Sequence, residues 1–71
     1  MLDELLPSID EIRQDGAVVI LKWDGERQNR PYTVLITRHD TDFLWRTDTN
    51  DMASALAEGL KSYQGSHRTE T

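Results

Sequence analysis

The chain has 71 residues, a formal net charge of −5 and no cysteine. This length predicts one domain, which buries only about 60% of the surface of its unfolded chain. Without cysteines, disulfides and thiolate metal sites are excluded as sources of stability, and a pI near 4.7 disfavours unaided binding to nucleic acid or to an anionic membrane.

Hydropathy and the first residues bear on the location of the protein. No apolar run approaches the ~20 residues of a membrane span. Asp3 and Glu4 stand where a secretory signal carries Lys or Arg. We therefore expect a cytoplasmic protein, of bacterial type, without membrane association.

The first segment, from Leu2 to Gln14, has the spacing of a helical stripe. Its apolar residues are Leu2, Leu5, Leu6, Ile9 and Ile12. Proline is harmless only in a first turn, so either the regular helix begins near Pro7 or Asp3 caps a distorted earlier start. Asp15-Gly16 is typical of a helix end.

Three strands are predicted next. They are Ala17–Asp24, Tyr32–Arg38 and Asp42–Arg46. The middle one is β-branched or aromatic at most of its positions, which suits a half-buried pleated surface. Asp24-Gly25 opens a polar loop before it. After it, His39-Asp40 predicts a two-residue hairpin turn, although neither residue is Gly and a slightly longer turn is equally compatible.

A second helix is predicted to end at about Tyr63. The cluster Thr47-Asp48-Thr49-Asn50-Asp51 holds N-cap residue types before it. Gly59 costs roughly 1 kcal/mol against Ala in a helix, which indicates a close approach to the sheet at that point. Residues 1–63 are thus one domain, and residues 64–71 are expected to be a disordered tail.

The strand register decides which side chains share a face. Pairing Trp23 with Tyr32, and Ile36 with Phe43, places the large apolar residues together: Val19, Leu21, Trp23, Tyr32, Val34, Ile36, Phe43 and Trp45. Both helices, each with one apolar stripe, should cover this face. The predicted fold is α+β, with the order α-β-β-β-α, a three-stranded antiparallel meander and two helices on one face.

The opposite face of the sheet is left without a cover. In the predicted register, Ile20, Leu35 and Leu44 lie side by side across it. The expected partner interface consists of Val18, Ile20, Thr33, Leu35, Leu44 and Arg46. A homodimer is the simplest occupant; the alternatives are surface aliphatics without a partner and a different register.

No pattern in the sequence indicates catalysis or a cofactor. His39 lies near Asp40 and Asp42, but one histidine without a second well-placed ligand is a poor metal site. Asp48 and Asp51 are explained by helix capping. The rings of Trp23, Tyr32, Phe43 and Trp45 could stack on bases, but their spacing favours the core. We expect no enzyme activity, no cofactor and no metal.

Two resemblances accompany this pattern. The α-β-β-β-α order is similar to that of the double-stranded RNA-binding domain, which grips phosphates with basic residues at the start of its second helix; here Asp48, Asn50 and Asp51 stand there. The segments 17–27, 32–36 and 52–60 resemble small bacterial proteins of this size, and that resemblance implies no activity or site residues.

The sequence therefore predicts a protein-interaction or regulatory module that uses the open sheet face. The alternative is a nucleic-acid-related protein, either a weak duplex binder or an acidic mimic of nucleic acid.

Overall fold

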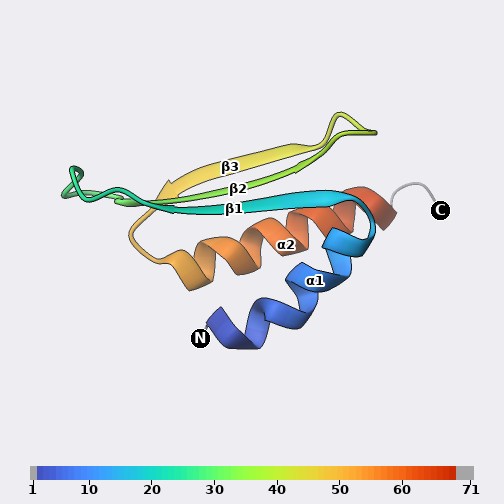
Figure 1. Ribbon diagram of the computed structural model, residues 1–71, viewed down its shortest axis with the longest axis horizontal. Helices are drawn as coiled ribbons and strands as arrows, with labels where there is room; N and C mark the ends of the chain where they lie inside the picture. The colour runs from blue at the N-terminus through green and yellow to red at the C-terminus, as the bar shows by residue number, and fades with distance from the viewer. Residues whose placement is uncertain (1, 69–71) are drawn as a thin grey trace.

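The computed structural model describes residues 2–68, which form the predicted α-β-β-β-α arrangement (Figure 1). A short 3-10 helix, η1 (Leu2–Leu5), leads into α1 (Leu6–Gln14). The antiparallel strands β1 (Ala17–Trp23), β2 (Tyr32–Arg38) and β3 (Leu44–Thr49) follow, and α2 (Met52–Arg68) comes after them. The sheet order is β1-β2-β3, so the predicted meander is confirmed.

The first helix begins regularly near Pro7. Leu6 opens α1 and the proline lies in its first turn, where the missing N–H costs nothing. At the other end, the N–H of Gly16 donates to the carbonyl oxygen of Arg13. Gly16 has φ of 103°, a left-handed conformation that glycine adopts without a steric penalty, so the chain can turn directly into β1.

The register between β1 and β2 is the predicted one, with Trp23 opposite Tyr32. The register between β2 and β3 was predicted wrongly by two residues, because Ile36 pairs with Trp45 rather than with Phe43. The connection takes residues 39–43, and the N–H of Thr41 donates to the carbonyl oxygen of Arg38 within it. A shift of two residues keeps each side chain on its predicted face.

The third strand is also displaced along the chain. It runs to Thr49 and so includes residues that were expected to cap the second helix. The cap is Asp51: its carboxylate accepts hydrogen bonds from the N–H and the hydroxyl of Ser54, at 3.2 and 2.9 Å. The helix then continues past the predicted end at Tyr63 to Arg68, and residues 69–71 of the predicted tail lie outside the described residues.

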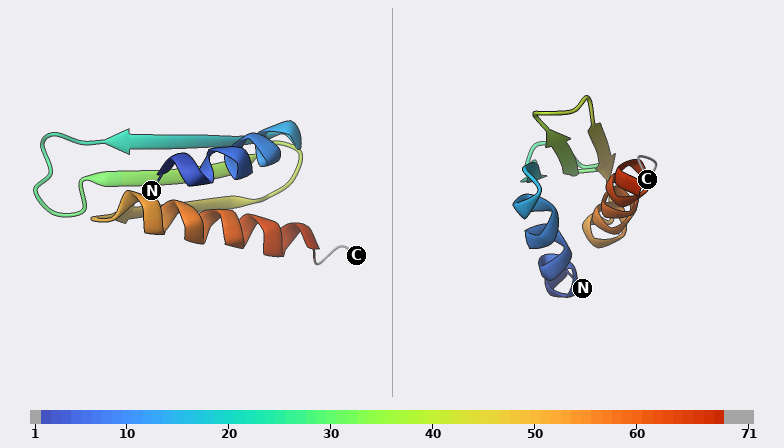
Figure 2. Two further views of the ribbon diagram at one scale, coloured as in Figure 1. Left: turned by 90° about the horizontal axis from the view of Figure 1, so that it is seen from below. Right: turned by 90° about the vertical axis from the view of Figure 1, so that its right-hand side faces the viewer.

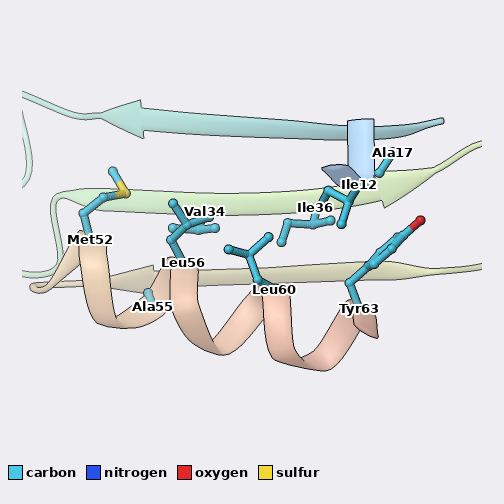
Figure 3. Packing of buried hydrophobic residues seen from close by; sticks show 9 residues of the cluster. All are labelled: Ile12, Ala17, Val34, Ile36, Met52, Ala55, Leu56, Leu60 and Tyr63. Carbon is cyan, nitrogen blue, oxygen red and sulfur yellow. The ribbon is translucent and has the colours of Figure 1, made fainter. Parts of the chain in front are cut away.

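Both helices lie on the same side of the sheet, as predicted (Figure 2). Val34 and Ile36 on β2 are fully buried and face Leu56 and Leu60 on α2, while Ile12 brings α1 to the same cluster (Figure 3). The core is therefore the single layer between the sheet and the helices, with Met52 at one end and Tyr63 at the other.

Helix α2 approaches the sheet most closely at Gly59. A Cβ atom at this position would lie 2.7 Å from the Trp45 ring and 2.9 Å from the side chain of Ile36. Real Cβ atoms do not come that close to other heavy atoms, because the repulsion is steep. The predicted close approach at Gly59 is confirmed.

One of the four rings expected in the core is not covered. Trp23 lies on the predicted side of the sheet, but 60% of its surface is exposed. Its only ring contact among the described residues is an edge-on one to Tyr32, at 6.4 Å between centroids. Trp23 is the last residue of β1 and lies at an end of the sheet. The expectation of a core tryptophan at this position was wrong.

Candidate functional site

The open face of the sheet carries an apolar patch with a different outline from the predicted one. In the observed register, Ile20 pairs with Leu35 and Leu35 pairs with Arg46, while Leu44 pairs with Thr37. The predicted row of three aliphatic residues was therefore wrong. The aliphatic side chains instead surround Thr37, and we call this group the open-face patch: Val18, Ile20, Leu35 and Leu44.

The patch is accessible at most of its positions. Leu44 is 67% exposed and Ile20 is 48% exposed, whereas Leu35 at the centre is half-buried between its neighbours. Exposed apolar residues are common singly, but here three of them, Val18, Ile20 and Leu44, lie around the half-buried Leu35 on adjacent strands. Of the predicted interface residues, the open-face patch and Arg46 are therefore exposed or half-buried.

Thr33 does not belong to an accessible interface. It lies on the open side, but only 6% of its surface is exposed. Its hydroxyl donates a 2.7 Å hydrogen bond to the carboxylate of Asp48 on the neighbouring strand. Two guanidinium groups flank that carboxylate, Arg27 at 3.5 Å and Arg46 at 3.6 Å. A polar cluster of Thr33, Asp48, Arg27 and Arg46 therefore lies at one end of the open face.

The environment of Asp48 favours its ionised form. The hydrogen bond from Thr33, followed by the charges of Arg46 and Arg27, holds the pKa of Asp48 below its usual value. A carboxyl group whose pKa is lowered by folding stabilises the protein above its unfolded pKa of about 3.9, and this stabilisation is lost as the pH falls through the lowered value.

Thr33→Val is expected to lower the free energy of unfolding by about 1 kcal/mol at neutral pH, because Asp48 loses a buried donor. The difference from the native protein should narrow below about pH 4, as Asp48 protonates. Urea unfolding at several pH values measures both effects. Thr37→Val, the same substitution four residues further along β2 on this face, is the control. An equal loss of stability in Thr37→Val would contradict the role of the Thr33–Asp48 bond.

A second feature is an open pocket on the helix side, at the end of the molecule where β1 ends and α2 begins. Its volume is about 480 Å³. Five of its lining residues are apolar or aromatic and three are polar: Leu2, Trp23, Tyr32, Met52 and Ala53, with Asp3, Asn50 and Asp51. We call it the Trp23 pocket. The sequence reasoning missed it, although a tryptophan at a strand end, directly before Asp24-Gly25, was a signal for exposure.

The wall of the Trp23 pocket is held by the loop between β1 and β2. The N–H of Arg30 donates to the side-chain oxygen of Asn50 at 2.8 Å, and the amide nitrogen of Asn50 donates to Asn29. Arg30 adopts a left-handed conformation, with φ of 51°, which is unfavourable for a residue with a side chain. The bond to Asn50 fixes this loop against the start of α2.

The remaining candidates for chemistry are surface groups. Asp40 does not pair with His39; both of its oxygens accept hydrogen bonds from Arg38, at 2.6 and 3.0 Å, and this bond lowers the pKa of Asp40. Among the side chains that the structure describes, those of residues 2–65, no three His, Cys, Asp or Glu groups lie close enough to hold a metal ion together. Phe43 and Trp45 lie on the covered side, where Phe43 contacts Tyr63 edge-on.

In comparisons with known proteins, the chain matches no family model, no curated protein and no solved structure. The resemblances to double-stranded RNA-binding domains and to small bacterial proteins therefore stay predictions. Within the described part of the chain, no helix has the length and apolar character needed to cross a membrane.

Proposed function

We propose that the protein is a small interaction module whose open sheet face binds another protein, and that a second copy of the chain is the simplest occupant. The observation that supports this is the open-face patch. Both helices pack on the other side of the sheet, so the described chain has no further element to cover Ile20, Leu35 and Leu44. A second sheet would cover them, as in face-to-face packing of sheets.

The distribution of charge on the open face is compatible with a two-fold arrangement. Lys22, Arg27 and Arg46 lie toward one end of the patch, around the carboxylate of Asp48, so this end carries a net positive charge. Asp42 lies beyond Leu44 at the other end. The turn that carries Asp42 bends away from the helices (Figure 1). If the two-fold axis runs across the strands, the basic end of one copy faces the acidic turn of the other. This attraction favours that orientation over a dimer whose axis runs along the strands, in which ends of like charge would meet.

The area of the open sheet face limits the affinity that is expected of the proposed dimer. Three strands about 4.8 Å apart, with seven residues rising about 3.3 Å each, give a flat footprint of roughly 330 Å². Stable complexes bury about 800 Å² on each partner. The proposed dimer is therefore weak, and it forms at high protein concentration.

Leu44→Lys and Leu35→Lys are expected to abolish self-association, because each places a charge in the middle of an apolar contact. Sedimentation equilibrium over a range of protein concentrations measures the effect, and far-UV circular dichroism checks the fold. Leu44 is largely exposed, so its substitution should leave the monomer intact even if Leu35→Lys destabilises it.

The matched control is Leu6→Lys, which adds the same charge at an exposed leucine on α1. It should associate like the native chain. A native chain that stays monomeric at millimolar concentration would exclude the dimer, and an equal loss of association in Leu6→Lys would show that net charge, not the patch, controls it.

The nucleic-acid alternative has less support. A double-stranded RNA-binding surface needs cations at the start of the second helix, whereas α2 is preceded by Asp51, whose pKa is lowered by hydrogen bonds from Ser54. Asp48, near the same junction, is ionised as well.

A further inference from the structure

The Trp23 pocket is independent of the open-face patch, because it lies on the helix side of the sheet end. Its most unusual member is Trp23, a large aromatic side chain left mostly exposed beside a hollow. Tyr32 meets it at an interplanar angle of 73°. The two rings thus form a corner in the lining of the pocket.

Carboxylates line the same pocket. Asp3 enters from η1 and Asp51 from the residue before α2. Both oxygens of Asp51 already accept hydrogen bonds from Ser54, which keeps its pKa low and its charge in place. A carboxylate has about four acceptor sites, so Asp51 retains capacity for a further donor.

Aromatic faces and carboxylates together recognise an organic cation. A cation within about 6 Å of a tryptophan or tyrosine face is attracted by the ring quadrupole, and the carboxylates add direct charge attraction. The positive end of the α2 dipole works against a cation here, but it is offset by the Asp51 carboxylate at that end. The side chain of Asn50 is a poor donor to a free anion, because its amide already accepts from Arg30 and donates to Asn29.

We propose that the Trp23 pocket binds an arginine side chain of a partner polypeptide. Arginine fits better than lysine, because its planar guanidinium group stacks on an aromatic face and donates to a carboxylate with a fork of N–H groups. The methylene stem would lie against Leu2 and Met52 at the pocket wall. The pocket is open on one side, so the ligand's main chain can remain outside.

The proposal is tested with the full chain and a short probe peptide, acetyl-Gly-Gly-Arg-Gly-Gly-amide. Amide and tryptophan-indole chemical shifts are followed by NMR during the titration. The control peptide carries citrulline, which has the shape of arginine without its charge. We expect shifts at Trp23, Met52 and Ala53 with the arginine peptide, at least threefold weaker binding with citrulline, and weaker binding at high salt.

Two variants locate the contact. Trp23→Ala should weaken binding at least threefold, since the ring face is lost, and Asp3→Asn should weaken it about two- to threefold. Asp10→Asn, which removes the same charge from the exposed face of α1, should bind like the native chain. If Trp23→Ala is poorly folded, Trp23→Phe replaces it in the test. This variant keeps an aromatic ring and should bind the peptide with an affinity between that of Trp23→Ala and that of the native chain.

Several results would overturn the proposal. The first is that the citrulline peptide binds as tightly as the arginine peptide. The second is that Trp23→Ala and Asp3→Asn both bind the arginine peptide with native affinity. The third is that Asp10→Asn loses as much affinity as Asp3→Asn. Shifts at the pocket that appear with protein concentration alone would assign it to a second copy of the chain instead. The Leu44→Lys variant should bind the peptide normally, so failure of the dimer and failure of this site are distinguishable.

Discussion

Replacing Leu56 by alanine is expected to lower the free energy of unfolding by about 2–5 kcal/mol. Leu56 is completely buried where α2 faces Val34 and Ile36 (Figure 3). The substitution removes apolar contacts and leaves a cavity that the single core layer cannot easily close. For a chain of 71 residues, typical total stability is roughly 4–11 kcal/mol, so this one change removes a large share of it.

Urea unfolding followed by circular dichroism measures this loss. The matched control is Leu6→Ala, the same substitution at a leucine of α1 that is 57% exposed; it should cost less than about 1 kcal/mol. If the two variants lost equal stability, Leu56 would not lie at the centre of the core.

The second large effect is expected at Gly59. Gly59→Ala should lower the free energy of unfolding by about 1–3 kcal/mol, because the new methyl group would overlap the Trp45 ring and force α2 away from the sheet. Helix propensity alone predicts the opposite sign, since alanine is better than glycine in a helix by about 1 kcal/mol. The sign of the change therefore decides between packing and propensity.

Gly65 supplies the comparison within the same helix. Within the described part of the chain, a Cβ atom there meets no heavy atom within 4 Å apart from its chain neighbours and its own helix backbone. Gly65→Ala should therefore raise the free energy of unfolding by roughly 0.5–1 kcal/mol. Unfolding curves of both variants, recorded side by side, give the answer. Stabilisation by Gly59→Ala would mean that Trp45 moves aside at little cost.

The α-β-β-β-α fold, and the side of the sheet that the helices cover, could both be predicted from the sequence. The middle strand was predicted with its observed bounds, because its β-branched residues and the flanking Gly and Pro signals agree. The β1–β2 register followed from matching large apolar side chains at both ends of the pair. These are local or periodic signals, and they are strong in a short chain.

The register of β3 could not be predicted in the same way. His39-Asp40 permits turns of different length, and Trp45 can pair with either Val34 or Ile36 without leaving its face. Thr47 and Thr49 are compatible with a strand as well as with a helix cap, because threonine is common in both. The two-residue error then moved Leu44 away from Leu35.

The sites were less predictable than the fold, because they depend on contacts between distant residues. The residues near Thr33 in the sequence do not predict its hydrogen bond to Asp48, fifteen residues later. Likewise, the Trp23 pocket combines η1, the end of β1 and the start of α2. The predicted patch residues Val18, Ile20, Leu35 and Leu44 kept their face, but the use of that face by a partner remains a proposal.

The meander has a consequence for how the chain reaches this structure. Each strand pairs with its neighbour along the chain through a short connection, residues 24–31 and 39–43, so closing each hairpin loses little chain entropy. Topologies of this kind fold fast for their size, commonly in milliseconds or less. Because α2 follows all three strands along the chain, the sheet's apolar side stays open to water at Val34 and Ile36 until α2 docks there.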